Sequence, residues 1–527
     1  MRWILRDKAK QLLEAEIGTV YKDPGGKITV CLISPNTYSV GMSGLGFQKV
    51  YHLLNSEVDV LCERAFLPQS DEIEEYLRTG SELFSLESTR PVNRFHIVAF
   101  SVSFENDYPN IVKLLHLANI PLRATERGEN APLIIMGGPC AFLNPEPVSP
   151  FFDVVFVGEA EELMPEFLAA YREAKDKTTL LAMCREVEGL YVPLLCQEEK
   201  DRRHVIKKRW TKDISCADQG FIVSPYTEFK EMRLIEVQRG CPRKCRFCVA
   251  GFAYKPSRTK DLKMLTKEIE QAGGKRVGLV GPSLSDVREI EKVFSVDSVE
   301  FSLTSLRAHP DTVMLAQVMQ NRRSLSIAPE AGTERMRKIV NKGLTDSDII
   351  TSATMLLDIT GNLRLYFIVG LPGETHEDIK GIVVLVNKIR KIQKKGFLTL
   401  SVSSFVPKPW TPFQWMPMEE LPALQKKINF LYKEVNHIKG VKLHFESPAL
   451  SLIQAVMARG DRTLSYAIED LASGRPWKKT LKSKEQGLHF PVPFDTPLAW
   501  DFIDTGVKKT FLEAECVRAL ELGTSQK

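Results

Sequence analysis

The chain of 527 residues has no run of about 18 apolar residues, the length that a membrane-spanning helix needs. Residues 1–8 also lack the continuous apolar stretch of a signal peptide. Apolar residues make up 43% of the sequence and charged residues 26%, as in an ordinary soluble protein. These features favour a cytoplasmic protein, and the length allows roughly two to four domains.

The sequence also has little net charge, only +5, and no internal repeat or low-complexity segment. Its one basic stretch, residues 201–209, has no recognised RNA-binding module around it. A solvated β-hairpin is the favoured interpretation of this stretch, and contact with nucleic acid is the alternative.

Most of the ten cysteines stand far apart along the chain, as reduced and packed thiols do. The scattered ones are Cys31, Cys62, Cys140, Cys184, Cys196, Cys216 and Cys516.

The other three cysteines, Cys241, Cys245 and Cys248, share one short loop. The spacing Cys-x3-Cys-x2-Cys supplies three thiolates, whereas a [4Fe–4S] cluster normally takes four. The fourth iron is then either held from elsewhere or left open for a small molecule. A zinc site or a redox pair is the alternative, but zinc loops usually show paired cysteines.

Strand-like apolar runs alternate with amphipathic helical stretches over the first 190 residues. This alternation predicts a doubly wound parallel sheet. The predicted strands are residues 28–33, 58–66, 97–104, 133–136 and 154–157, and the predicted helices include residues 108–118 and 161–174. Glycine-containing loops follow three of the strands, at residues 36–46, 137–140 and 158–162. Such sheets bind ligands at the carboxyl ends of their strands, and glycine lets a backbone approach a large flat ligand.

A second series of strands and helices runs from residue 234 to about residue 446, after a polar, β-rich connection over residues 191–233. The predicted strands are residues 234–238, 277–280, 298–303, 324–327, 363–369 and 398–405. Six such units predict a partial or complete parallel barrel, with its chemistry at the carboxyl ends of the strands. The three-cysteine loop directly follows the first strand. Residues 447–527 are interpreted as a small helical cap.

Four more strand ends in this series carry unusual loops, at residues 281–286, 328–335, 370–375 and 405–413. Each is a weak signal alone, because Gly-Pro loops occur in many α/β proteins. In this order behind the cysteines, they resemble the radical S-adenosylmethionine (SAM) superfamily. The resemblance implies a (β/α)6-type partial TIM barrel, with a [4Fe–4S] cluster whose open iron is chelated by the amino and carboxylate groups of SAM.

The resemblance also implies the residues of the site. Cys241, Cys245 and Cys248 would ligate the cluster, and Glu330 would hydrogen-bond the ribose or amino groups of SAM. The alternative for Glu330 is a helix N-terminal acid stabilised by the helix dipole. The remaining cofactor-binding residues would be Phe247 before the last cysteine, Gly281, Pro282 and Ser283 at the methionine end, and Ile368 and Gly370 beside the adenine. No catalytic residue is assigned.

Three basic residues, Arg243, Lys244 and Arg246, lie in the cysteine loop. They would favour an anionic, thiolate-ligated cluster, and a solvated loop face is the alternative.

The resemblance extends over nearly the whole chain, through residues 36–46, 84–88, 137–147, 158–162 and 500–507. These segments are similar to bacterial radical SAM proteins that carry a cobalamin-binding-type, Rossmann-like N-terminal domain and have no assigned substrate. Two features depart from relatives. No Asp-x-His-x-x-Gly motif marks a lower cobalt ligand, and only Cys516 lies near the C-terminus, so no second cluster is predicted.

We therefore predict a cobalamin-binding-type domain at residues 1–190, a linker at 191–233, a radical SAM barrel at 234–446 and a cap at 447–527. The predicted activity is reductive cleavage of SAM, in its sharpest form by a cobalamin-dependent methyltransferase. Alternatives are a cobalamin-independent radical SAM enzyme, an RNA-modifying enzyme like the methylthiotransferases, and a SAM- or corrinoid-sensing regulator. The predicted partner is a low-potential electron donor such as flavodoxin or ferredoxin. The sequence does not identify the substrate.

Overall fold

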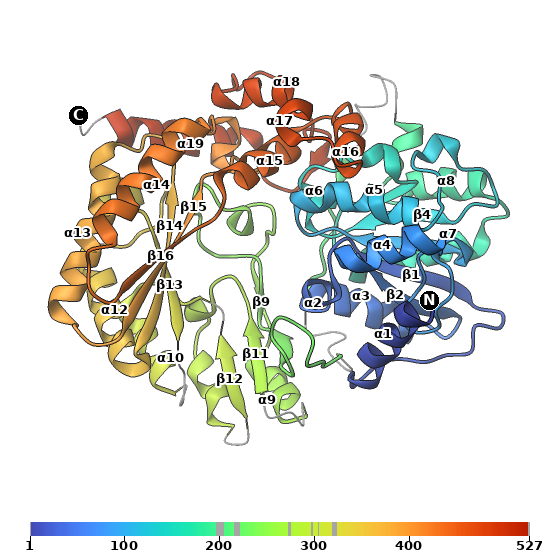
Figure 1. Cartoon of the computed structure of the whole chain (residues 1–527), viewed down its shortest axis with the longest axis horizontal. Helices are drawn as coiled ribbons and strands as arrows, with labels where there is room; N and C mark the ends of the chain where they lie inside the picture. The colour runs from blue at the N-terminus through green and yellow to red at the C-terminus, as the bar shows by residue number, and fades with distance from the viewer. Residues whose placement is uncertain are drawn as a thin grey trace. The chain divides into compact units, whose positions relative to one another are not determined.

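The computed structural model describes residues 2–196, 205–214, 222–271, 276–296, 299–303, 305–318 and 324–524. The chain forms two compact units (Figure 1). Unit 1 comprises residues 1–234, 457–482 and 497–506, and unit 2 comprises residues 235–456, 483–496 and 507–527. Residues 447–527, grouped by the sequence into one cap, are thus divided between the two units. The linker at 191–233 belongs to unit 1.

Unit 1 is built on a six-stranded sheet, which confirms the predicted doubly wound fold. Its strands are β1 (Ile28–Ser34), β2 (Val60–Phe66), β3 (Ile97–Ser101), β4 (Leu133–Gly137), β5 (Val154–Phe156) and β6 (Leu190–Tyr191). Their order is β2-β1-β3-β4-β5-β6. The first five pair in parallel, and β6 is antiparallel to β5. In this order the winding reverses between β1 and β3, the switch point where doubly wound sheets bind ligands.

The central strands of unit 1 are buried almost throughout, as expected when helices cover both faces of a parallel sheet. The helices are α1 (Arg2–Glu14), α2 (Tyr38–Gly41), α3 (Leu45–Ser56), α4 (Ser70–Thr79), α5 (Tyr108–Leu117), α6 (Pro139–Leu143), α7 (Ala160–Glu173) and α8 (Lys177–Glu186). From the C-terminal part of the chain, α16 (Leu464–Ala472) packs on α5.

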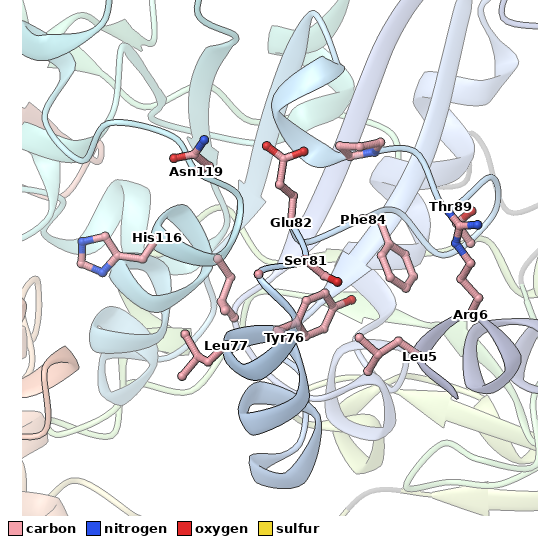
Figure 2. A pocket seen from close by; sticks show the side chains of 13 residues that line it. Leu5, Arg6, Tyr76, Leu77, Ser81, Glu82, Phe84, Thr89, His116 and Asn119 are labelled. Carbon is pink, nitrogen blue, oxygen red and sulfur yellow. The ribbon is translucent and has the colours of Figure 1, made fainter. Parts of the chain in front are cut away.

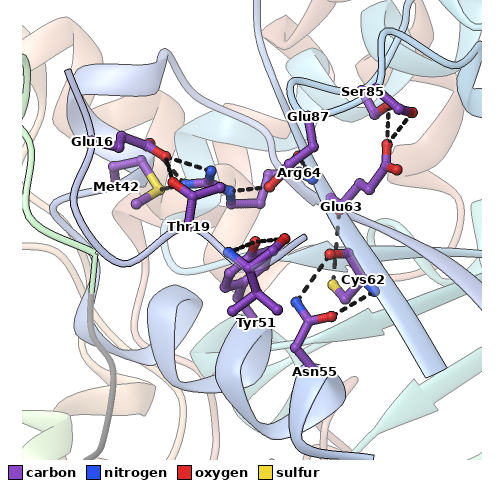
Figure 3. A network of polar contacts seen from close by, with 12 residues as sticks. Glu16, Thr19, Met42, Tyr51, Asn55, Cys62, Glu63, Arg64, Ser85 and Glu87 are labelled. Atoms are coloured by element: carbon purple, nitrogen blue, oxygen red, sulfur yellow. Dashed lines mark hydrogen bonds and ion pairs between the residues drawn. The ribbon is translucent and has the colours of Figure 1, made fainter. Parts of the chain in front are cut away.

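A buried arginine links three segments of unit 1 (Figure 3). The guanidinium of Arg64, on β2, is fully buried and binds both carboxylate oxygens of Glu16, at 2.9 and 2.7 Å. Its Nε donates to Glu87 at 2.7 Å, and the guanidinium lies 4.8 Å from the centre of the Tyr51 ring. The network ties the segment after α1 and the loop before β3 to the sheet.

The predicted β-hairpin at residues 201–209 is wrong where the structure describes it. Strand β7 (Ile206–Lys207) pairs in parallel with β17 (Ile503–Asp504), and parallel neighbours cannot form a hairpin. Residues 201–204 lie outside the described residues. Lys208 is buried, with its ammonium 5.1 Å from the centre of the Phe142 ring, so this part of the basic stretch is not a uniformly solvated face.

Unit 2 contains the predicted partial barrel, in two sheets. One has the order β12-β11-β8 and the other the order β13-β14-β15-β16, and a parallel bridge between Leu306 and Ile327 joins them. The strands are β8 (Arg233–Glu236), β11 (Arg276–Val280), β12 (Glu300–Leu303), β13 (Leu325–Glu330), β14 (Asn362–Val369), β15 (Phe397–Ser404) and β16 (Val441–Phe445). The first six of these match the strands predicted from the sequence, whereas β16 was not predicted. Two short strands, β9 (Gln238–Arg239) and β10 (Arg258–Thr259), pair antiparallel beside the cysteine loop.

Helices cover one face of the four-stranded sheet of unit 2: α12 packs on β13 and β14, and α14 packs on β16 (Figure 1). The helices of this unit are α9 (Leu262–Gln271), α10 (Val313–Val318), α11 (Glu334–Ile339), α12 (Asp346–Thr360), α13 (His376–Ile392), α14 (Leu421–Val435) and α19 (Lys509–Thr524). The segment between α14 and α19 also holds α15 (Pro448–Arg459), α17 (Trp477–Thr480) and α18 (Lys482–Glu485). Among the helices that the structure describes, none combines the length and apolarity of a membrane span.

The Arg64 network yields a stability prediction. Replacing Arg64 by Ala leaves Glu16 and Glu87 buried without a cation, which should destabilise unit 1 by roughly 3–5 kcal/mol. Hydrogen exchange of the amides of β1 and β2 measures this loss. The matched control is Arg78→Ala, because Arg78 is half exposed and pairs with Glu75 on the surface of α4. The control should cost less than about 1 kcal/mol, and equal losses in the two variants would contradict the prediction.

Candidate metal centre and cofactor site

The three-cysteine loop follows β9 and closes on itself through backbone contacts. The amide of Cys241 donates to the carbonyl of Ala250 at 2.8 Å, and the amide of Cys248 donates to Cys245 at 3.0 Å. Glycine is required at both ends of the loop. Gly240 has φ +75°, and a Cβ there would lie 2.3 Å from the Tyr254 carbonyl oxygen. A Cβ on Gly251 would lie 2.2 Å from the Arg243 carbonyl oxygen. The loop is therefore a tightly wound turn that presents three thiols.

The three thiols lie close enough to influence one another electrostatically. Burial raises the pKa of Cys241 and Cys248, and it raises the pKa of Cys245 to about 11. Neighbouring cysteines raise each of these pKa values further. Without metal the thiols are thus protonated, and binding of iron would displace their protons. Within the described ranges, no three His, Cys, Asp or Glu side chains converge on one metal ion. A cubane cluster places its cysteines on separate irons and does not need such convergence.

A buried arginine fastens the cysteine loop to two helices. Arg246 is only 3% exposed, and its Nη1 donates to the carbonyls of Lys338 and Ile339 at 3.1 and 2.7 Å, at the end of α11. Its guanidinium also pairs with Glu515 of α19 at 3.0 Å. Because carbonyls and a carboxylate compensate the buried charge, the loop has one defined position relative to α11 and α19.

The solvated loop face that was the alternative interpretation holds in part, because Arg243 and Lys244 are exposed. Arg246 is buried, the Nε of Arg243 donates to Asp286 at 2.8 Å, and Lys244 lies 5.4 Å from the centre of the Phe511 ring. Another cation, Lys342, lowers the pKa of both Cys245 and Cys248.

Lys342 and Glu330 form a partly buried ion pair beside the thiols. The ammonium of Lys342 is 2.9 Å from Oε1 of Glu330, and the side chains are 15% and 13% exposed. Burial alone would lower the pKa of Lys342, but the Glu330 carboxylate together with Cys245 and Cys248 raises it. Glu330 therefore faces a cation beside the cysteine loop and is not merely an acid at a helix N-terminus.

The backbone of Glu330 is in the left-handed region, with φ +68°, after an irregularity in the pairing of β13 with β14. This conformation is unfavourable for a glutamate and is typically found where a side chain must be aimed for function. Sequence reasoning identified Glu330 but missed Lys342. Lys342 lies between Asn341 and Gly343, which both have positive φ, so the sequence around it indicates only a tight turn.

The loop after β11 carries Gly281, Pro282 and Ser283. A Cβ on Gly281 would lie 2.8 Å from Leu284, and the amide of Ser283 donates to Gln238 Oε1 at 3.2 Å. Gln238 belongs to β9, which immediately precedes the cysteine loop, so the loop after β11 is held next to it. Phe247 is half-buried within the cysteine loop itself.

Ile368 and Gly370 lie at the carboxyl end of β14. Gly370 has φ +79°, and its amide donates to Glu374 at 2.7 Å. Burial raises the pKa of Glu374 to about 7, although Lys427 lies 2.7 Å away and lowers it. The cysteine loop, residues 281–283, Glu330 and Gly370 thus all follow strands of one partial barrel, at the edge where such barrels carry out chemistry.

The glycines expected to form a ligand floor in unit 1 are largely explained by packing within the unit. A Cβ on Gly41 would lie 2.8 Å from the Phe66 ring. Gly138 and Gly158 lie against backbone. A Cβ added to Gly138 would lie 2.6 Å from the Val102 oxygen, and one added to Gly158 would lie 2.4 Å from the Arg209 oxygen. Gly137 differs, because a Cβ there meets nothing within 4 Å. The same loops contain Gly44, where a Cβ would lie 3.1 Å from the Gly41 oxygen, and Gly46, where it would meet nothing within 4 Å, so both Gly46 and Gly137 leave open space.

The switch point of unit 1 is lined by polar side chains. Asn36 follows β1, and its amide donates to Asp107 at 2.9 Å, in the segment that follows β3. Burial raises the pKa of Asp107 to about 6. The loops after β1, β3, β4 and β5 contain no histidine, since His52, His96 and His116 lie on α3, before β3 and on α5.

A cavity of about 500 Å³ in unit 1 lies apart from these loops (Figure 2). It is lined by residues of α1, by the ends of α4 and α5, and by the chain leading to β3. The rings of Tyr76 and Phe84 meet in it with their centres 5.7 Å apart. None of the predicted site residues lines this cavity.

Comparisons with known proteins agree with this architecture. Residues 46–193 match the family described as the N-terminal part of radical SAM proteins, and residues 235–386 match the radical SAM superfamily. An uncharacterized protein of Methanocaldococcus jannaschii is 30% identical over 452 residues, which cover 84% of this chain and 90% of that protein. A tRNA-2-methylthio-N(6)-dimethylallyladenosine synthase of Sulfurihydrogenibium sp. is 27% identical over 226 residues, 39% of this chain and 50% of that protein.

Among solved structures, the chain is similar to the cobalamin-dependent S-adenosylmethionine radical enzyme OxsB with aqua-cobalamin bound. The TM-score is 0.51 at 12% identity, covering 95% of this chain and 81% of that one. At this identity the likeness shows a shared fold. The family matches imply a [4Fe–4S] cluster and SAM as cofactors, and three thiols in one loop suit that cluster. The matched N-terminal and core domains, with a relative aligned over most of both chains, show that this protein belongs to the radical SAM superfamily.

Proposed function

We propose that the protein reductively cleaves SAM at a [4Fe–4S] cluster held by Cys241, Cys245 and Cys248. The observation that carries the proposal is the partly buried Lys342–Glu330 pair, which lies beside the thiols of a self-closed loop. When bound, the cluster would chelate SAM at its open iron and deliver one electron to the sulfonium. The electron would come from a low-potential donor such as flavodoxin or ferredoxin.

Lys342 and Glu330 would bind the polar groups of SAM. The ammonium of Lys342 is a partly buried cation near the thiols, where it would stabilise the SAM carboxylate and the anionic ligands together. Among the described residues, the hydrogen bond to Glu330 comes from Lys342 and reaches Oε1. Its Oε2 can therefore accept from the amino group or a ribose hydroxyl of SAM.

The other strand ends would hold the rest of SAM. The backbone at Gly281 and Ser283 lies next to the cysteine loop through Gln238, which suits contact with the methionine end. Ile368 and Gly370 would flank the adenine from the end of β14. Phe247 would cover the cluster from within the loop, helping to exclude water from a radical reaction.

The sharper form of the proposal is a methyltransferase that uses cobalamin in unit 1. Two observations favour it: the switch point between β1 and β3, with its polar pair Asn36–Asp107, and the fold shared with OxsB. The corrinoid would supply the methyl group, and the substrate is not identified. Gly41, Gly138 and Gly158 do not support this form, because they serve internal packing. No histidine of the carboxyl-edge loops would ligate the cobalt.

Cluster ligation is tested with single Ala variants of Cys241, Cys245 and Cys248, purified without oxygen. Each should lose iron, sulfide and SAM cleavage together, because a missing thiolate leaves an iron without its protein ligand. The matched control is Cys184→Ala, which changes a fully buried thiol of unit 1 and should keep about four irons per chain. Full iron content in a variant lacking all three cysteines would refute the assignment.

The SAM-binding role of Glu330 is tested with Glu330→Gln, which keeps the shape of the side chain and removes its charge. The dissociation constant of SAM for the cluster-loaded protein should rise roughly 5- to 150-fold, the equivalent of about 1–3 kcal/mol for a lost buried contact. Glu377→Gln is the control, because Glu377 is exposed and pairs with Lys380 on the surface of α13. Calorimetric titration gives both constants. An unchanged constant in Glu330→Gln would mean that the ribose or amino group lies elsewhere.

Corrinoid binding is tested by titrating the protein with hydroxocobalamin and recording the absorbance of the bound cofactor. Saturation should occur below about 100 μM. Gly137→Val places a side chain in the open space at the end of β4 and should weaken binding at least about tenfold, whereas Gly128→Val, also in open space, should not. No binding by the unaltered protein would leave a cobalamin-independent radical SAM enzyme.

A further inference from the structure

The inner face of the four-stranded sheet in unit 2 is polar, whereas the interior of a parallel barrel is usually filled by branched apolar side chains. Along β14 and β15 buried and more exposed residues alternate. Helices α12 and α14 pack on this sheet (Figure 1), and the burial of Leu363, Leu365 and Leu400 indicates that this set faces the helices. Because side chains alternate along a strand, the other set points to the inner face.

Two rows of side chains cross this inner face. In the first row Arg364 pairs with Thr399, which pairs with Lys442. In the second row Tyr366 pairs with Ser401, which pairs with His444. Paired positions of parallel strands share a face, adjacent strands are about 4.8 Å apart, and the rows are about 6.6 Å apart. The six residues thus span the dimensions of a small molecule and include cations and hydroxyls but no carboxylate.

The side chains of these rows have few partners within the protein. In the part of the chain that the structure describes, the side chains of Arg364, Tyr366 and His444 form no hydrogen bond or ion pair with another residue. Tyr366 is 37% exposed, and Lys442 has its ammonium 5.9 Å from the centre of the Phe397 ring. Elsewhere in this unit, arginines are engaged: Arg337 binds two backbone carbonyls and pairs with Asp346. The donors of the inner face are therefore available to a ligand.

We infer that this inner basic face, defined by Arg364, Tyr366, Lys442 and His444, binds an anionic group of the substrate, a phosphate or a carboxylate. The inference rests on the proposed function, because it places the substrate in the same barrel as SAM. A guanidinium recognises both anions through two parallel hydrogen bonds, and hydroxyls of tyrosine and serine add donors. The two rows themselves contain no carboxylate, and the next position on this side after His444 is the exposed Glu446, just beyond the end of β16.

The position along the strands also suits a substrate anchor. Tyr366 lies three residues and Arg364 five residues before the end of β14, about 10 and 17 Å along the strand. An anion held there leaves the remainder of the molecule pointing toward the carboxyl edge, where Glu330 and the cysteine loop lie. The substrate would then lie inside the barrel and SAM at the carboxyl ends of its strands, so that the two molecules would be neighbours.

The inference is tested by chemical modification of arginine in the full chain. Phenylglyoxal should modify Arg364, since its guanidinium is exposed and unpartnered among the described residues, and mass spectrometry of the peptides gives the rate at each arginine. Sodium phosphate or sodium succinate at 50 mM, compared with sodium chloride at equal ionic strength, should slow modification of Arg364 about tenfold for a Kd near 5 mM. Arg94, an exposed arginine of unit 1, should react at an unchanged rate.

Two variants localise the effect. Lys442→Gln should reduce the protection of Arg364 at least about threefold, because the two residues flank the same row. Lys391→Gln, which changes an exposed lysine of α13 on the helix-covered side, should leave the protection intact.

Protection by phosphate alone or by succinate alone supports the inference and identifies the anion, and protection by both supports an anion site of broad specificity. No protection by either, equal slowing at Arg94, or full protection in Lys442→Gln would overturn it. SAM cleavage is measured separately in the same preparations. A protein that shows protection but no cleavage would contradict the proposed function and leave the anion site standing.

Discussion

The compensated charge of Arg246 is the constraint on which the candidate site depends. A guanidinium removed from water is costly unless carboxylate and carbonyl partners surround it. Here the partners come from α11 and α19, two helices far from the cysteine loop and from each other along the chain. The three thiols are therefore positioned by long-range packing as well as by their own spacing. Gly240 and Gly251 allow the tight turn of the loop, and Arg246 fixes the position of the loop relative to α11 and α19.

Unit 1 also contains a buried arginine whose charge is compensated by carboxylates. Arg64 joins Glu16 and Glu87, and the network also reaches the loop at residues 36–46, because Tyr38 donates to Glu16 at 2.6 Å and Arg64 contacts Met42 Sδ at 3.2 Å. In unit 2 the ion pair of Lys342 with Glu330 has further neighbours, the thiols of Cys245 and Cys248. Burial of an ion pair is thus not by itself a sign of function. The neighbouring thiols and the left-handed backbone of Glu330 distinguish the second case.

In both units, the pattern of apolar residues was enough to predict those strands in which apolar residues are continuous or alternate strictly. It failed for β16, whose residues are all partly exposed and whose inner-face positions are Lys442 and His444, so little apolar signal remains. The cysteines and Glu330 could be proposed as site residues because they lie at strand ends in the order of a known family. Lys342 could not, since its relation to Glu330 exists only after α11 has folded back. The packing of Gly41, Gly138 and Gly158 within unit 1 could not be predicted, because the sequence does not tell whether a small residue faces a ligand or its own protein.

The contribution of α19 to the cysteine loop has a consequence for the order of events during synthesis. Glu515 leaves the ribosome long after Cys241, Cys245 and Cys248, and until then Arg246 lacks its carboxylate. Until then, the cysteine loop lacks the ion pair between Arg246 and Glu515. The position of the cysteine loop relative to α19 is therefore fixed only after this helix has been synthesised and has packed.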